Sequence, residues 1–147
     1  MKYRTPRAGW PRGEWDSEPD SMQWKDDETG IDCFIVRHRD MGHLCGYVVI
    51  PDDHPWHGRD YDDIGDVECH GGLTFFGVHR WYPVDALAWL IGFDCSHYDD
   101  LAPGLGGTLG QWKLLDGVYR NIEYVKAECA KLAKLAAEAA RAGAPCG

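Results

Sequence analysis

Two short stretches of the 147-residue sequence place titratable side chains beside glycines at the ends of apolar runs. The first is HGGLTFFG, residues 70–77, and the second is WLIGFDCSHYDD, residues 89–100. Each apolar run has the composition of a buried strand, and neighbouring strands in a sheet lie about 5 Å apart. The polar ends of the two runs can therefore converge on one cavity, and we predict a functional site there.

The chemistry that these residues could support is of three kinds. His70, Asp94 and His97, with Asp99 and Asp100 nearby, offer ligands for a divalent metal or a general acid and base. The spacing matches no diagnostic metal motif such as H-E-x-x-H, so we predict no bound cofactor and keep a divalent metal on His70, Asp94 and His97 as the alternative. In a purely structural alternative, Asp94 closes a turn and His70 bonds a backbone carbonyl.

An organic ligand is the third use of the site, and we favour it because a few polar groups with aromatic neighbours are typical of small-molecule pockets. The Gly71-Gly72 pair would expose backbone N–H donors to such a ligand. The loop PDDHPWHGRDYDD, residues 51–63, could stack on a base and pair with a phosphate, although a solvated acidic loop is the alternative. The predicted ligand-binding residues are His70, Gly71, Gly72, Thr74, Asp94, His97, Trp56, Arg59, Tyr61 and Arg80.

Nucleophilic catalysis is not favoured by the sequence. Ser96 lies outside a G-x-S-x-G element, and Cys95 continues an apolar run in which we expect a buried thiol. The glycine-rich stretch GLGGTLG, residues 104–110, lacks the lysine of a phosphate-binding loop and is expected to be a connector.

The net charge, the cysteines and the length of the apolar runs narrow the classes of partner and the cellular location that we expect. A formal net charge of −9 argues against direct nucleic-acid binding and against docking on an anionic membrane. None of the six cysteines lies in a C-x-x-C pair and no secretory signal precedes them, so we expect reduced thiols in a cytoplasmic protein. No apolar run approaches the ~18–20 residues of a membrane span.

The elements that must position the site form a single predicted α+β domain over residues 31–147. Apolar patterning predicts strands at 31–37, 43–50, 67–78 and 86–95, with the first two joined as a hairpin. One amphipathic helix is expected at about 118–141. We predict a small, mostly antiparallel sheet of about four to five strands, covered on one face by that C-terminal helix.

The two ends of the chain carry separate expectations. Residues 1–30 are rich in Trp and Pro, and we predict a segment draped over the domain and held by its indoles, with a disordered tail as the alternative. In the expected helix, one apolar stripe is assigned to the core. Its later part, with Leu132, Leu135 and Ala139, could pair with a second copy, so we expect a homodimer.

Three segments resemble a family of small, functionally uncharacterised proteins encoded by phages and prophages: HGGLTFFG, WLIGFDCSHYDD and YRNIEYVKAECAKLA. Members of that family carry H-G-G-[LI]-T, then G-F-D-[CT]-A-H, then a C-terminal helix that opens Y-R-[DN]-x-x-Y-V. The resemblance covers about residues 43–135 and leaves 1–30 unmatched. Ser96 stands where the family has alanine, and Tyr98-Asp99 stands where Gly-Asp is usual.

The resemblance implies a phage protein in the cytoplasm of a bacterial host and, by analogy with viral proteins that sequester nucleotide second messengers, a role in counter-defence. The leading hypothesis is therefore a phage-encoded protein that binds a small polar or nucleotide-like molecule. One alternative is a metal-dependent hydrolase that uses His70, Asp94 and His97. The other is an acidic protein that inhibits a host defence nuclease by covering its nucleic-acid-binding site.

Overall fold

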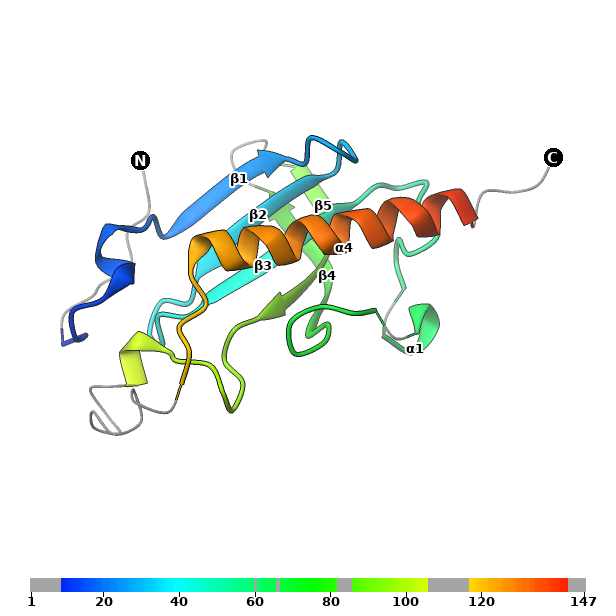
Figure 1. Ribbon diagram of the computed structural model, residues 1–147. Coiled ribbons are helices and arrows are strands. Elements are labelled where there is room, and N and C mark those ends of the chain that lie inside the picture. Colours follow the sequence, from blue (N-terminus) through cyan, green and yellow to red (C-terminus); the bar gives the residue numbers. More distant parts are fainter. Residues whose placement is uncertain (1–8, 60, 66, 82–85, 106–116, 143–147) are drawn as a thin grey trace.

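The computed structural model describes residues 9–59, 61–65, 67–81, 86–105 and 117–142. The elements follow one another along the chain as shown in Figure 1: a 3-10 helix at Glu14–Ser17, β1 at Ser21–Lys25, β2 at Asp32–Arg37, β3 at Leu44–Ile50, α1 at Tyr61–Ile64, β4 at Phe75–Trp81, β5 at Ala86–Asp94, a 3-10 turn at Pro103–Leu105 and α4 at Ile122–Ala142.

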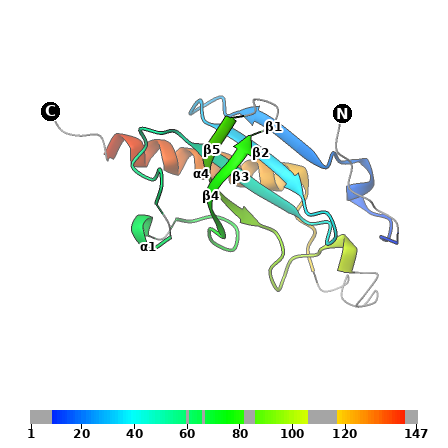
Figure 2. The ribbon, with the colours of Figure 1, turned by 180° about the vertical axis from the view of Figure 1, so that it is seen from behind.

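The strands form one five-stranded sheet in the order β1-β2-β3-β5-β4, and all neighbouring pairs are antiparallel. The helix α4 crosses one face of the sheet (Figure 1), and the view from behind shows the strands in front of it (Figure 2). The predicted α+β architecture, a small antiparallel sheet under one C-terminal helix, is confirmed.

The core lies between α4 and the sheet. Burial alternates along β3, with Leu44, Val48 and Ile50 fully buried, as period-2 patterning requires for a strand with one covered face. Gly46 lies on the same face, and a Cβ built there would come within 2.7 Å of the sulfur of Cys129. The helix therefore packs directly against the backbone of β3.

Burial on α4 corrects one expectation. Leu132 has no exposed surface and belongs to the hydrophobic core, so it cannot contact a second copy as the sequence suggested. Leu135 and Ala139 are half-buried. Any helix-mediated homodimer would have to form without Leu132.

The N-terminal segment adds the edge strand β1, which the sequence pattern does not predict. Trp15 is buried, its indole N–H donates to the Pro11 carbonyl, and its ring packs against Tyr119. Glu18 accepts a hydrogen bond of 2.8 Å from the backbone N–H of Ile122, the first residue of α4. The segment is thus tied both to the sheet and to the start of the helix, because a helix N-terminus favours a carboxylate.

The third strand begins later than the sequence indicates, at Phe75 rather than at residue 67. Gly71 and Gly72 have φ angles of +66° and +84°, in the left-handed region that a strand cannot use. Residues 69–72 form a turn instead, closed by a hydrogen bond from Gly72 N–H to the Cys69 carbonyl. No helix within the described ranges combines the length and the apolar character needed to cross a bilayer.

Candidate functional site

His70 lies in the turn before β4 and is fixed by hydrogen bonds at both ring nitrogens. Nε2 lies 2.7 and 2.9 Å from the two carboxylate oxygens of Asp100, and Nδ1 lies 2.7 Å from the hydroxyl of Tyr124. The side chain of His70 is only 9% exposed and that of Asp100 is fully buried. The imidazole is therefore held in one orientation by groups from two other segments of the chain.

Asp100 is the centre of this network. Its carboxylate also accepts hydrogen bonds from Nε of Arg120, at 2.8 Å, and from the backbone N–H of His97, at 3.0 Å. Burial alone would raise the pKa of Asp100, but the hydrogen bonds from His70, Arg120 and the His97 N–H outweigh burial and lower it. Asp100 is accordingly a carboxylate that accepts hydrogen bonds and donates none.

Tyr124 connects the network to α4. Its hydroxyl lies 3.3 Å from Oε1 of Glu128, one helical turn further along, and Arg120 lies over its ring. Burial raises the pKa of Tyr124, and the negative charge of Glu128 adds to the shift. The phenol therefore stays neutral. Glu128 in turn forms an ion pair of 3.3 Å with Lys131.

Asp94 and His97 lie beside this network, as the sequence predicts for the end of β5. Asp94 accepts a hydrogen bond from Ser96 N–H at 3.1 Å and so closes a turn, in agreement with the structural alternative for this residue. Nε2 of His97 is buried, 3.4 Å from Asp94, and the rings of His97 and His70 meet edge to face at 5.6 Å. The polar ends of the two chain segments do face each other, but His70 bonds Asp100 rather than Asp94 or a backbone carbonyl.

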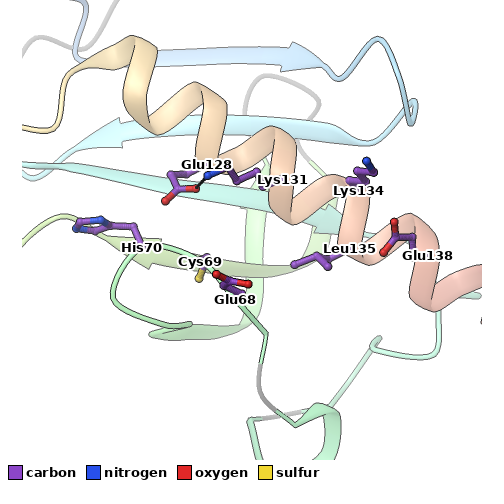
Figure 3. A pocket seen from close by; sticks show the side chains of 8 residues that line it. All are labelled: Glu68, Cys69, His70, Glu128, Lys131, Lys134, Leu135 and Glu138. Carbon is purple, nitrogen blue, oxygen red and sulfur yellow. Dashed lines mark ion pairs between the residues drawn. The ribbon is translucent and has the colours of Figure 1, made fainter.

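A groove opens next to His70, between α4 and residues 68–70 (Figure 3). Its volume is about 470 Å³, within the range of about 300–1,000 Å³ found for ligand sites. Among the described residues, Lys134 forms no ion pair, whereas Lys131 pairs with Glu128. The groove is lined by Glu68, Cys69, His70, Glu128, Lys131, Lys134, Leu135 and Glu138.

Of the predicted ligand-binding residues that the structure describes, only His70 lines this groove. Trp56 packs against the hydrophobic core, and Arg59 is exposed and is not among the lining residues. Thr74 is exposed and its N–H pairs with Gly92 at the start of the β4–β5 ladder. The side chains of Tyr61 and Arg80 lie outside the described part of the structure.

The metal alternative finds no support in the geometry. Within the described residues, no group of three or more His, Cys, Asp or Glu side chains is arranged to hold a metal ion. Both nitrogens of His70 are already hydrogen-bonded, so His70, Asp94 and His97 do not form a ligand set.

The cysteines near the site are protonated thiols. Burial raises the pKa of Cys69 to about 12 and raises the pKa of Cys95 still further, with nearby carboxylates adding to both shifts. The five described cysteines are free. A thiolate–imidazole pair of Cys95 with His97 is therefore not formed, because the thiol stays protonated.

The sequence does not predict the two hydrogen-bond partners of His70, Asp100 and Tyr124, nor the hydrogen bond from Arg120 to Asp100. Asp100 was among the candidate carboxylates, but its pairing with His70 has no local sequence signal. Arg120 and Tyr124 fall in the segment YRNIEYV, the third stretch that carries the family resemblance. The chain matches no protein-family model, and neither curated proteins nor solved structures give a significant match.

Proposed function

We propose that this protein binds a small polar molecule with an anionic group in the groove between α4 and residues 68–70. The observation that carries the proposal is the joint presence of a groove of about 470 Å³ and a lysine, Lys134, that forms no ion pair with a described carboxylate. A charge-assisted hydrogen bond to a lysine is about twice as strong as a neutral one, so an anion gains most from this position.

The remaining lining residues suit a ligand that also carries hydrogen-bond donors. Glu68, Glu128 and Glu138 present carboxylates, which accept hydrogen bonds from amino or hydroxyl groups. His70 is held rigidly by Asp100 and Tyr124, and a group that is already fixed loses no further entropy when a ligand binds. Both features favour recognition of a polar molecule.

A nucleotide-type signal is the first ligand class to test. Its phosphate matches Lys131 and Lys134, and the resemblance to phage-encoded proteins implies a counter-defence setting in a bacterial cytoplasm. Apart from the imidazole of His70, no aromatic side chain lines the groove among the described residues. A base would therefore be recognised through its hydrogen-bonding edge rather than by stacking.

Binding without turnover is favoured over catalysis by the state of the polar groups. Both nitrogens of His70 are occupied, and the neighbouring thiols stay protonated because burial raises their pKa. The thiols are therefore not nucleophiles, and a general base would have to come from the carboxylates of the groove.

The test is retention of a molecule from a defined panel. The purified protein is incubated with cyclic dinucleotides, ADP-ribose-type nucleotides, mononucleotides and sugar phosphates, then washed and heated, and the released molecules are identified by mass spectrometry. We expect one class to be retained and released intact. Lys134→Met should weaken its affinity by about tenfold or more.

The matched control is Lys126→Met, because Lys126 lies on the same helix but over the ring of Trp24, outside the groove. It should bind as the wild type does. Release of a chemically altered molecule would replace the binding proposal with an enzyme, and equal affinities of the two lysine variants would remove the groove from the proposal.

A further inference from the structure

A continuous hydrogen-bond chain joins the buried carboxylate of Asp100 to the groove. It runs from Asp100 through His70 to Tyr124 and ends at Glu128, with donor–acceptor distances of 2.7, 2.7 and 3.3 Å. Glu128 lines the groove and Tyr124 does not. The chain thus links a titratable imidazole to a carboxylate that a bound ligand meets.

The tautomer of His70 follows from its partners. Asp100 is a carboxylate with both oxygens within 2.9 Å of Nε2, and a carboxylate only accepts hydrogen bonds. Nε2 therefore carries a proton in both charge states of the ring. The nitrogen that gains or loses a proton is Nδ1, which faces the hydroxyl of Tyr124.

The Tyr124 hydroxyl has one proton and two acceptors within reach. While Nδ1 is unprotonated, the hydroxyl donates to it at 2.7 Å, and the longer distance of 3.3 Å to Glu128 fits a second, weaker contact. Once Nδ1 carries a proton, it donates to the phenol oxygen, and the hydroxyl proton turns to Glu128. Protonation of His70 thus supplies Glu128 with a hydrogen-bond donor.

That donor changes the charge balance in the groove. The Glu128 carboxylate is otherwise paired with Lys131 at 3.3 Å. When the Tyr124 hydroxyl donates to Glu128, the ion pair between Glu128 and Lys131 weakens. Lys131 can then bind an anion together with Lys134.

The other charges around the imidazole do not reverse this direction. Asp100 is balanced by Arg120 at 2.8 Å, and His97 is next to Asp94. Glu68 and Cys69 directly precede His70 in the sequence, and the Cys69 thiol is neutral because burial raises its pKa to about 12.

We infer that Tyr124 is a positioning residue that couples protonation of His70 to the anion affinity of the groove, so that the site takes up an anionic ligand together with a proton. The inference rests on the proposed function, since it concerns the same groove. It adds that the ligand is an anion bound more tightly as the pH falls.

Inorganic sulfate is a suitable probe because its charge stays the same across the pH range in which histidines titrate. Backbone amide shifts of α4 are followed by NMR while sulfate is added at about pH 5.5 and about pH 8. Coupling between two sites typically changes affinity by 5- to 150-fold, and we expect sulfate to bind on the order of tenfold more tightly at the lower pH.

Two variants separate the coupling from the binding. Tyr124→Phe keeps Lys131 and Lys134 but lacks the hydroxyl, so its sulfate affinity at about pH 8 should stay within about twofold of wild type while most of the pH dependence is lost. Glu128→Gln removes the negative charge that pairs with Lys131 and should give a similarly flat profile. His57→Gln changes a partly exposed histidine that is not part of the hydrogen-bond chain from Asp100 to Glu128. This variant should keep the full pH dependence of sulfate binding.

The outcomes are distinguishable. Sulfate binding with the same affinity at both pH values, or a full pH dependence in both Tyr124→Phe and Glu128→Gln, overturns the coupling and leaves the proposed function standing. No sulfate binding to the groove at either pH overturns the anion site itself. A pH-dependent wild type with two flat variants supports the coupling.

Discussion

Gly71 sets the distance between the two histidines of the site. Its φ is +66°, and a Cβ built there would lie 2.1 Å from Nε2 of His97. Gly71→Ala should therefore lower the free energy of unfolding by about 2–4 kcal/mol, because it adds a steric overlap to the cost of left-handed backbone. Urea denaturation measures this change.

Gly72 is the matched control for Gly71→Ala. Its φ is +84°, but a Cβ built there meets nothing within 4 Å. Gly72→Ala should cost only the backbone term, about 1–2 kcal/mol. Equal losses in the two variants would show that His97 moves away at no cost and that Gly71 does not fix the spacing of the rings.

His43 makes stability depend on pH near the same site. It is buried and stacked on His38, and burial, followed by the positive charge of His38, lowers its pKa from 6.5 to about 4. Between these two values the unfolded chain binds a proton that the folded chain does not, so stability is complete above about pH 6.5 and falls as the pH drops to about 4.

The shift corresponds to about 3 kcal/mol of unfolding free energy lost across that interval. His43→Gln should remove this part of the pH dependence, as measured by urea denaturation at about pH 7, 5.5 and 4. His57→Gln, at a partly exposed position, should leave it in place. A wild type and a His43→Gln variant with parallel pH profiles would contradict the assignment.

At the scale of elements, patterning in the sequence located the strands β2, β3 and β5 and the helix α4 to within a few residues. β3 alternates with a period of 2 and α4 with a period of 3.6, and both match the faces that are buried, whereas β2 and β5 were found as continuous apolar runs. The edge strand β1 was missed because only Met22 and Trp24 of its five residues pack on the core, between proline- and aspartate-rich stretches.

The site was predictable only in part, for a reason that also belongs to this scale. His70, Asp94 and His97 were found because each follows an apolar run, and the sheet brings the ends of those runs together. The partner Tyr124 depends on how α4 lies across the sheet and is 54 residues from His70, and the partner Asp100 depends on the turn that follows β5. A sequence period fixes which face of a helix is buried, but not which residue of another segment that face meets.

At the scale of the whole molecule, the class of partner and the oligomeric state remain predictions from the sequence. The net charge of −9 still argues against direct nucleic-acid binding. Leu132 can take no part in a homodimer through α4 because it is buried in the core, whereas Leu135 and Ala139 are half-buried. The groove includes Leu135, so dimerisation and ligand binding would compete for part of the same helix face.

The N-terminal segment supplies hydrogen-bond and ion-pair partners to the buried guanidinium of Arg37. Arg37 is 1% exposed, and its guanidinium donates to the carboxylate of Asp20 at 2.8 Å and to the carbonyl of Pro19 at 3.1 Å. It also lies 3.5 Å from the carboxylate of Glu18. Removing partners from a buried ion typically costs about 3–5 kcal/mol, a large part of the 5–15 kcal/mol that stabilises a domain.

Deletion of residues 1–20 should therefore abolish or strongly weaken cooperative unfolding, because among the described residues it leaves Arg37 with Gly42 and Tyr119 as partners, and it removes the buried Trp15. Deletion of residues 1–8 keeps all of these contacts and serves as the control. Arg37→Met in the background of the longer deletion should restore part of the stability, because an apolar side chain needs no partner there. If the longer deletion unfolds like the shorter one, the segment is an accessory tail and the buried arginine finds other partners.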